Sequence, residues 1–363
     1  MIATMVSALV PCYGDLHLLE LSLPRLLASS VDDLDVVLLN NDATQSAGVA
    51  ALVSSIADPR VRLLELEHGA GFAMAVNSGI AATRGDLVFL ANSDLFVAAD
   101  YLTWMERFFA THPRAGGATG KILRFDLMQG EETRILDTTG HTIGRDRGAS
   151  DRGENLEDVG QYEAEEQVFS VSGAALVARR EALASVKLRG QYLDESFFMY
   201  KEDVDLSWRL RLAGWECWYV PQALAYHART SLAPPGGKYL SGIRAFHANE
   251  RAKPRHVRVH SMKNQWLMLV KNEDASNLVR HLPFILGREA LVLGYNTLFA
   301  PRVTLSALRG FVGALPRSLE NRSAIKSKQI VTPREIREWF VPRSQSTAVV
   351  RGTGSERRPV DHG

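Results

Sequence analysis

Residues 87–94 read Leu-Val-Phe-Leu-Ala-Asn-Ser-Asp, a run of five apolar residues followed directly by three polar ones. A short apolar run that ends in turn-forming residues is typical of a strand buried in a parallel sheet. Apolar residues recur at helical spacing before it, in Phe72–Ala82, and after it, in Ala99–Ala110. The stretch therefore predicts a strand between two helices, with a polar loop at the carboxyl end of the strand.

The same alternation occupies the rest of the first 125 residues. The further strands are predicted at Val6–Val10, Val36–Leu39 and Val61–Leu64, and the further helices at Leu16–Ala28 and Val49–Ala57. This order predicts an α/β fold with a Rossmann-like, mostly parallel central sheet flanked by helices. Ligands bind such sheets beyond the carboxyl ends of the strands. There the chain places Pro11-Cys12-Tyr13-Gly14, Asn40-Asn41-Asp42 and Asn92-Ser93-Asp94, which are polar and prone to turns.

The later part of the chain is less regular. Residues 126–166 are rich in glycine and charge, which predicts a long excursion or flap. Order returns at Val168–Val177, a strand-like run, and at Phe197–Val220, where a helix is expected to end at Gly214. Residues 263–320 are helical and amphipathic, and residues 344–363 have the composition of a disordered tail.

The charge of the chain is divided between its two parts. The composition is ordinary for a globular protein, with 46% hydrophobic and 23% charged residues, which excludes wholesale disorder and a multi-span membrane protein. The formal net charge of +1 arises because residues 1–250 carry 22 Lys and Arg against 33 Asp and Glu, whereas residues 251–345 carry 17 against 6. An acidic body is therefore joined to a basic C-terminal third.

The sequence also suggests a compartment. Its two cysteines, Cys12 and Cys217, are too few for a disulfide framework and fit a reducing environment. Met1–Val10 lacks the basic start of a signal peptide. The most apolar long window, Leu282–Ala300, is interrupted by an arginine and a glutamate, so a spanning helix is not expected. We expect a cytoplasmic protein.

Acidic residues and one histidine stand where the predicted site should lie. They are Asp42, Asp94, Glu202, Asp203, Asp205 and His227. Oxygen ligands with one imidazole suit Mg²⁺ or Mn²⁺, and those ions pair naturally with a diphosphate. Each residue alone also has a structural interpretation, as a turn former, a partner of a helix N-terminus or a hydrogen-bonded core histidine.

The order of five motifs removes much of that ambiguity. They are Leu9-Val10-Pro11-Cys12-Tyr13, Asn41-Asp42, Gly71–Ile80, Phe89–Asp94, and Phe198–Arg209 followed by Gly214-Trp215. Together these motifs resemble the family 2 glycosyltransferases of the GT-A fold, over roughly residues 5–270. Within that family the chain looks most like the rhamnosyltransferase-type branch, which builds cell-surface polysaccharides.

The resemblance implies a role for each residue. Asp203 would be the catalytic base, and Glu202 and Asp205 would hold acceptor hydroxyls. Asp94 and His227 would bind Mg²⁺ or Mn²⁺. The nucleotide-sugar would be bound by Pro11, Tyr13, Asp42, Gly71, Asn77, Asn92 and Ser93. The chain departs from the family's Asp-x-Asp motif at Asn92, which brings no charge to a metal, so the need for a divalent ion stays open.

The basic third allows two interpretations. In residues 278–320 arginines alternate with large apolar residues. This pattern fits an interfacial helix pair on an anionic membrane, and equally a helical subdomain packed on the catalytic domain or a homodimer interface. Nucleic acid is not expected as a partner, because the region has no recognition motif. The predicted division is a catalytic domain at 1–265, with a nucleotide-sugar half at 1–125 and an acceptor half at 166–265, then a helical region at 266–343 and the tail.

The predicted function is transfer of a sugar, with inversion, from dTDP-rhamnose or a UDP-sugar to a glycan or polyprenyl-linked acceptor, in a cytoplasmic protein attached to the inner face of the membrane. Two alternatives remain at this stage. A sugar nucleotidyltransferase would need a Gly-rich basic loop after the first strand, which Pro11–Asp15 lacks. An inactive sugar-binding or scaffold protein would have no reason to keep Asp94, Asp203 and His227 together.

Overall fold

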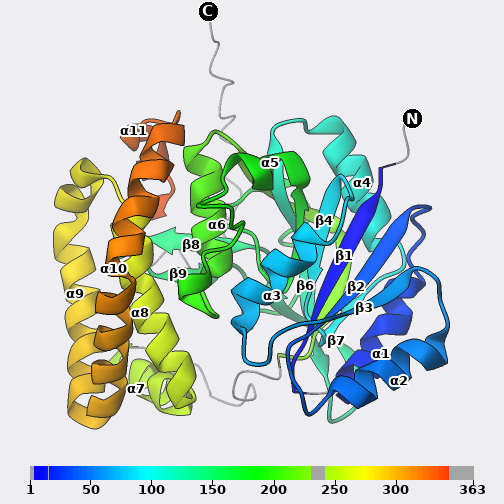
Figure 1. Cartoon of the computed structure of the whole chain (residues 1–363). Coiled ribbons are helices and arrows are strands. Elements are labelled where there is room, and N and C mark those ends of the chain that lie inside the picture. Colours follow the sequence, from blue (N-terminus) through cyan, green and yellow to red (C-terminus); the bar gives the residue numbers. More distant parts are fainter. Residues whose placement is uncertain (1–3, 15, 230–241, 343–363) are drawn as a thin grey trace, which may run out of the picture.

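A twisted sheet with helices on both faces forms the body of the protein (Figure 1). The computed structural model describes residues 4–14, 16–229 and 242–342. Strands β1 (Val6–Cys12), β2 (Leu34–Asn40), β3 (Val61–Glu65) and β4 (Leu87–Ala91) are parallel, in the order β4-β1-β2-β3. They alternate with α1 (Leu16–Leu27), α2 (Ser46–Ile56), α3 (Gly71–Ala81) and α4 (Tyr101–Thr111). The strand–helix units predicted from the sequence are therefore confirmed.

The sheet continues past β4 with mixed strand directions. Its full path is β10-β12-β6-β11-β4-β1-β2-β3, with β5 (Leu95–Val97) paired to β12 and β7 paired to β6. The added strands are β6 (Ala115–Asp126), β10 (Glu166–Gln167), β11 (Ala175–Arg179) and β12 (Glu216–His227). Strand β11 is antiparallel to β4 and β6, so the second half of the sheet is mixed rather than parallel. The sequence did not predict β6, because its glycines interrupt the apolar run; at Gly120 a side chain would strike the backbone of Ala223.

The segment expected to be a flap is folded. Residues 126–166 contain β7 (Glu131–Thr138), β8 (His141–Gly144) and β9 (Ala149–Asp151), and β8 also pairs with β13 (Phe340–Val341) near the end of the described chain. Ion pairs hold this segment where an apolar run is missing: Arg229 contacts Asp151 and Glu154, and the fully buried Arg147 contacts Glu273. The prediction of a flap was wrong because it weighed apolar periodicity alone.

The two faces of the sheet have separate cores. Helices α1, α2 and α4 cover one face, where Leu23 and Met105 pack against β1 and β2. Helices α3, α5 (Arg180–Ser185) and α6 (Glu202–Leu212) cover the other face. On that face α6 is buried from Val204 to Leu212, because further helices pack on its outer side.

These outer helices are α7 (Gly242–Ala252), α8 (Arg255–Asn272), α9 (Ala275–Phe299), α10 (Pro301–Lys328) and α11 (Pro333–Arg337), and they stand together beside α6 (Figure 1). Trp208 and Leu212 of α6 share one apolar core with Leu267, Met268 and Ile325 of the outer helices. The predicted boundary at residue 265 therefore falls inside α8, which runs unbroken across it. The predicted disordered tail lies outside the described residues.

Within the described ranges, none of the helices combines the length and the apolar character that a bilayer-crossing helix needs.

A buried charge network fixes α6 against α8. Asp205 of α6 is 0% exposed, and its oxygens accept from Arg209 Nε (3.0 Å) and Asn272 Nδ2 (2.8 Å). Lys271 of α8 is also fully buried, and its Nζ lies 3.0 Å from Asp205 Oδ1 and 2.6 Å from Asp194 Oδ2. Charges this deep are tolerated only when each has partners, so the network sets how the two helices meet.

The network gives a stability prediction. Asp205→Ala should lower the free energy of unfolding by about 3–5 kcal/mol, because it leaves buried cations without their carboxylate. Asp35→Ala, which removes the partner of the partly exposed Arg62, should cost at most about 1 kcal/mol. Urea unfolding of both variants measures the difference, and equal losses would contradict the assignment.

Candidate active site

The loops at the carboxyl end of the sheet meet through one short segment, residues 172–174. The backbone N–H of Asn92, just after β4, donates to the carbonyl of Ala174 (3.0 Å). The N–H of Gly173 donates to Asp203 Oδ2 at the start of α6 (2.9 Å). These two bonds bring the Asn92–Asp94 turn and the Asp203 carboxylate, predicted separately from the sequence, to the same edge of the sheet.

His227 lies between two carboxylates at this edge. Strand β12 runs antiparallel to β5 and pairs His227 with Leu95, the residue after Asp94. Its Nε2 is 3.1 Å from Asp94 Oδ1, and its Nδ1 is 2.9 Å from Asp137 Oδ2. Burial by itself lowers the pKa of His227, but Asp94 and Asp137 outweigh it and raise that pKa to about 10. The ring is therefore an imidazolium at neutral pH and donates to both carboxylates.

The predicted metal ligands Asp94 and His227 are thus brought together. Among the described residues there is no group of three His, Cys, Asp or Glu side chains arranged to hold a metal. Mg²⁺ is commonly bound by only one or two protein carboxylates and completes its shell with water and substrate phosphates, and Asp94 can supply such a carboxylate with His227 beside it. Such binding would require His227 to lose a proton, since only neutral imidazole is a ligand.

Asp203 and Glu202 form a pair of neighbouring carboxyl groups at the start of α6. Asp203 is held by two backbone donors, Val204 N–H to Oδ1 (2.7 Å) and Gly173 N–H to Oδ2. Glu202 Oε2 is buried and has no hydrogen-bond partner in the described part of the chain. Burial, and then the charge of Asp203, raise the pKa of Glu202 to about 8. Near neutral pH Glu202 is therefore protonated, beside a carboxylate with fixed orientation.

The backbone that leads into this pair is strained. Phe198, Tyr200 and Lys201 all have positive φ, between 66° and 69°, which non-glycine residues seldom adopt. Asn264 of α8 stabilises this segment through its Nδ2, which lies 2.7–3.0 Å from the carbonyls of Phe197, Met199 and Tyr200. Strain of this kind concentrates at functional sites, where the surrounding structure can hold it.

Three of the predicted nucleotide-binding residues, Pro11, Tyr13 and Asp42, lie at the carboxyl ends of β1 and β2. Pro11 and Tyr13 stand at the end of β1, and the Tyr13 side chain is 69% exposed. The Asp42 carboxylate accepts from the N–H and hydroxyl of Thr44, and these bonds hold its pKa below the usual range. Asp42 is therefore a charged acceptor at neutral pH. Contact of these residues with a nucleotide stays a prediction.

Two other predicted residues serve the framework. Asn77 is buried; its Nδ2 donates to Leu193 O and Glu195 Oε1, and its Oδ1 accepts from the N–H groups of Tyr192 and Leu193. Its amide is fully used in holding the 192–195 loop. Asp205, expected to hold an acceptor hydroxyl, is instead enclosed in the network between α6 and α8. Both act on the site by positioning the loop and helix beside it.

Three residues of the site were not found from the sequence. Asp137 lies in the segment that showed no periodic pattern, Arg229 follows the last strand-like run, and Asn264 belongs to a helix that the charge pattern assigned to another region. Nothing in their local sequence marks them, because their roles depend on contacts between distant segments.

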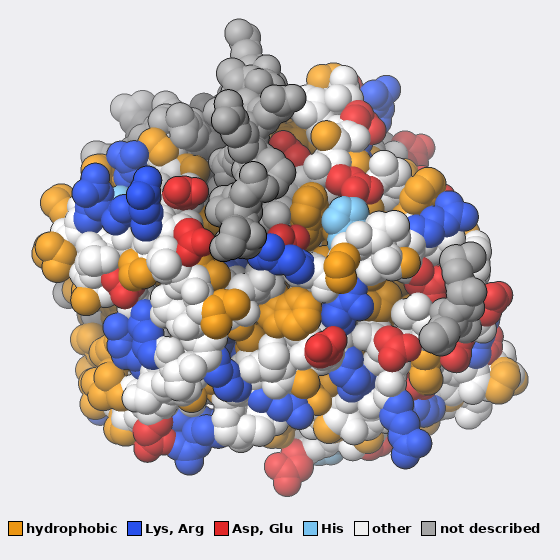
Figure 2. Space-filling model, turned by 90° about the horizontal axis from the view of Figure 1, so that it is seen from above, with side chains coloured by type: hydrophobic (Ala, Val, Ile, Leu, Met, Phe, Trp, Pro, Cys, Tyr) orange, Lys and Arg blue, Asp and Glu red, His pale blue; other side chains and the backbone are white. Residues whose placement is uncertain are grey.

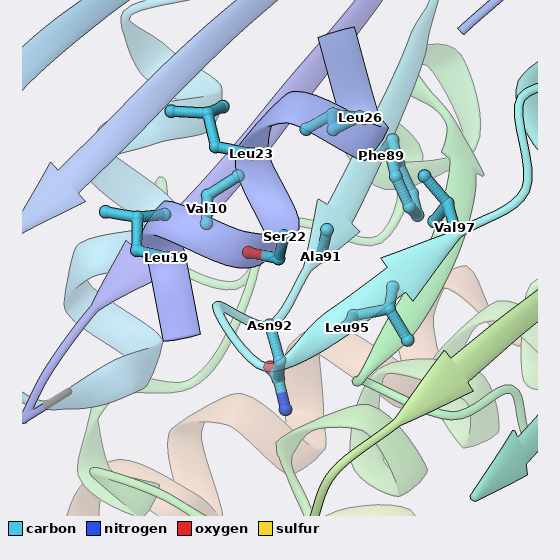
Figure 3. Close-up of a pocket in the computed structure, with 10 residues that line it drawn as sticks. All are labelled: Val10, Leu19, Ser22, Leu23, Leu26, Phe89, Ala91, Asn92, Leu95 and Val97. Atoms are coloured by element: carbon cyan, nitrogen blue, oxygen red, sulfur yellow. The ribbon is translucent and has the colours of Figure 1, made fainter. Parts of the chain in front are cut away.

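The enclosed cavity behind the Asn92–Asp94 turn is not a ligand site. It has a volume of about 10 Å³, close to the space of one water molecule. Figure 3 shows its lining of apolar side chains from α1, β1, β4 and β5, with the Asn92 amide at its lower end pointing away from them. Ser22 of α1 donates to the carbonyl of Ser93 (2.7 Å) and so fixes the turn from behind. The turn that carries Asn92 and Ser93 is thus fixed from two sides, by Ser22 and by the carbonyl of Ala174.

Comparison with known proteins identifies the family to which these features correspond. Residues 3–236, nearly two thirds of the chain, match the family model described as "Glycosyltransferase like family 2". An N-acetylglucosaminyl-diphospho-decaprenol L-rhamnosyltransferase of Mycobacterium tuberculosis is 31% identical over 241 residues, covering 58% of this chain and 71% of the relative. A poly-beta-1,6-N-acetyl-D-glucosamine synthase of Staphylococcus aureus is 24% identical over 224 residues, covering 61% of this chain and 49% of that protein.

Solved structures show the same fold. TarS 1-349 of S. aureus in complex with UDP-GlcNAc aligns with a TM-score of 0.52 at 12% identity, over 92% of this chain and 90% of that one. GalNAc-T7 with UDP, GalNAc and Mn²⁺ aligns with a TM-score of 0.52 at 12% identity, over 74% of this chain and 48% of that one. The chain therefore has the GT-A glycosyltransferase fold predicted from its motifs.

Two glycines at the start of α3 give a matched test of the strained segment. Gly69 and Gly71 both have φ of +76°, but a Cβ at Gly69 would meet open space, whereas one at Gly71 would lie 2.5 Å from the Phe198 ring. Gly69→Ala should cost about 1–2 kcal/mol from backbone strain alone. Gly71→Ala should cost about 1–3 kcal/mol more, because it also displaces Phe198. Urea unfolding measures the loss of unfolding free energy in both variants. Equal losses would show that the Phe198 ring moves aside at no cost in free energy.

The two ion pairs of His227, with Asp94 and with Asp137, give a prediction about pH. The pKa of His227 in the folded protein lies above its unfolded value of about 6.5. The two ion pairs therefore contribute their full stability below pH ~6.5, and this contribution is lost as the pH rises toward 10. In an NMR titration without metal, His227 should stay protonated through pH 8. Asp137→Asn should lower its pKa by roughly one unit or more. Glu154→Gln, which removes a partner of Arg229 without touching His227, should lower the pKa of His227 by less. A larger decrease in Glu154→Gln than in Asp137→Asn would contradict the pairing of His227 with Asp137.

Proposed function

The chain belongs to the glycosyltransferase-like family 2 and is a glycosyltransferase, and we propose that it moves a sugar, with inversion, from a nucleoside-diphosphate donor to a hydroxyl of a glycan or polyprenyl-linked acceptor in cell-surface polysaccharide synthesis. One observation carries this proposal: the 172–174 segment joins the Asn92–Asp94 turn to Asp203 at one sheet edge. A donor diphosphate and an acceptor hydroxyl can meet there.

In the proposed reaction, Asp203 is the general base. Its two backbone hydrogen bonds fix the carboxylate, and each oxygen keeps a lone pair that can accept the proton of an acceptor hydroxyl. That hydroxyl then attacks the anomeric carbon from the face opposite the diphosphate. Glu202, protonated beside it, can donate a hydrogen bond to a neighbouring hydroxyl of the acceptor.

The leaving diphosphate is proposed to lie toward Asp94 and His227. A divalent cation bound there would neutralise the charge that develops on the leaving group. Asp94 and His227 would hold the cation, and Asp137 would keep the Nδ1–H of His227 oriented so that Nε2 faces it. Asn92, which is uncharged, would accept from a ribose hydroxyl rather than assist the cation. Asp42, Pro11, Tyr13, Gly71 and Ser93 would surround the base and sugar.

The donor proposed first is dTDP-rhamnose, with a UDP-hexose or UDP-galactofuranose as the alternative. The 31% identity to a decaprenol-linked rhamnosyltransferase supports this order, as it supports a lipid-linked acceptor. We also propose that the protein works in the cytoplasm at the inner face of the membrane. The exposed apolar residues of α9 and α10, such as Leu282, Phe299 and Leu305, support such contact, and the same surface would serve a homodimer.

Release of nucleoside diphosphate from dTDP-rhamnose and UDP-sugars, with and without Mn²⁺, tests the function directly. Asp203→Asn should lower turnover by about 10²–10⁴-fold, because it removes the base, while calorimetry finds donor binding nearly unchanged. Turnover of no donor by the wild-type protein would favour a sugar-binding role instead. A comparable loss of donor affinity in Asp203→Asn would contradict the assignment of the base.

A further inference from the structure

A groove with a volume of about 390 Å³ lies between α9 and the turn that joins β8 to β9. Its walls are mostly apolar, with Pro283, Phe284 and Leu291 from α9 and Pro342 after β13, and Arg145 and Arg288 also line it. The volume is in the usual range for sites that bind small molecules, roughly 300–1,000 Å³. The roles proposed above for the sheet edge do not use this groove.

Positive charge gathers around the groove. Burial, and then Arg147, Arg145, Arg280 and Arg337, lower the pKa of His281 on α9 to about 4. The acids nearby are Asp146 in the lining, Glu289, which pairs with Arg288, and Glu273, which pairs with Arg147. Arg145 stands over the Phe284 ring, 6.0 Å from its centre, so a cation adjoins the apolar wall itself.

The groove and the proposed active site are close enough for their charges to interact. Arg288 of the groove is close enough to Lys201, the residue before Glu202 and Asp203, to help burial lower the pKa of Lys201 to about 7. Helix α8 lies between them: Asn264 holds the carbonyl of Tyr200, and Trp266 Nε1 donates to Glu289 Oε2 on α9 (2.6 Å). Helix α8 therefore connects the segment before Glu202 to α9, whose residues line the groove.

We propose that this groove binds the lipid carrier of the acceptor, an isoprenoid diphosphate, with its hydrocarbon against Pro283, Phe284 and Leu291 and its diphosphate beside Arg145 and Arg288. The inference rests on the proposed function and specifies its acceptor. Apolar walls suit the chain, and the arginines suit a diphosphate, which they recognise through paired hydrogen bonds. A flat membrane contact would need no cavity of this volume.

The surroundings of the groove fit a longer chain. Beyond it, α9 exposes Leu282, Leu286, Leu298 and Phe299, and Figure 2 shows hydrophobic side chains alternating with Lys and Arg along the edge of the molecule where this helix stands. A prenyl chain too long for the groove could continue over this surface into a bilayer. The groove would then place the first prenyl units and the diphosphate, and the surface would carry the rest.

Gly287 allows a direct test. It lines the groove, and a Cβ there would meet nothing within 4 Å, so a side chain can begin at this position and a bulky one would take up space in the groove. Gly294, two turns further along α9, is equally open but does not line the groove. Farnesyl diphosphate binding to the full chain, measured by calorimetry, should be weaker by about tenfold or more in Gly287→Trp and unchanged in Gly294→Trp.

The controls separate the possible outcomes. Inorganic diphosphate should bind much more weakly than farnesyl diphosphate, and phosphatidylglycerol vesicles should not compete for the groove. Equal farnesyl diphosphate binding in both variants, or displacement by the vesicles, would overturn the proposal. If Gly287→Trp abolishes farnesyl diphosphate binding but the wild-type protein turns over no donor, lipid binding in the groove is supported and the proposed sugar transfer is contradicted. If both variants transfer sugar to a lipid-linked acceptor equally well, the proposed role of the groove is contradicted and the proposed sugar transfer is supported.

Discussion

The buried pair of Asp205 and Lys271 is the interaction on which the rest of the structure depends. It joins α6, which carries Glu202 and Asp203 at its start, to α8 of the basic third. Because α6 is enclosed on both sides, its polar residues must find partners inside the protein, and Arg209, Lys271 and Asn272 provide them for Asp205. The direction of α6, and so the position of its first residues, follows from this requirement.

The C-terminal helices therefore take part in building the site. Asn264 holds the carbonyls of a segment with three positive φ angles, and Lys263 Nζ donates to the carbonyl of Ser196 (2.5 Å) just before it. Without α8 the strained backbone would lose the donors that compensate for its conformation. A catalytic domain that ended near residue 265 would keep the residues that carry the chemistry but cut through the helix that positions them.

The sequence predicted what depends on local pattern. The runs that became β1 to β4 were found because buried parallel strands are continuously apolar. Local pattern also singled out Asp94, Asp203 and His227 at the ends of elements, and their roles stay predictions. The missed parts depend on distant partners. Strand β6 is glycine-rich because other backbone and side chains approach it closely, and β7 to β9 are ordered by Arg147 and Arg229 rather than by apolar periodicity. The burial of Asn77 and Asp205 likewise needs loops and helices far along the chain.

The division of charge along the chain follows from two different requirements. Lys263 and Lys271 point inward and reach the catalytic half, Lys263 at the carbonyl of Ser196 and Lys271 at the carboxylate of Asp194. Arg322 donates instead to the carbonyls of Val270 and Glu273 at the end of α8. Arg145 and Arg288 meet at the groove instead, where they stand beside apolar walls. Cations placed next to apolar surface lose part of their hydration, and an anionic ligand compensates for that loss better than water alone. Of the basic residues after position 250, Lys263 and Lys271 therefore serve the assembly of the proposed active site, whereas Arg288 joins Arg145, from the acidic part of the chain, at the groove proposed to take an anionic, partly apolar ligand.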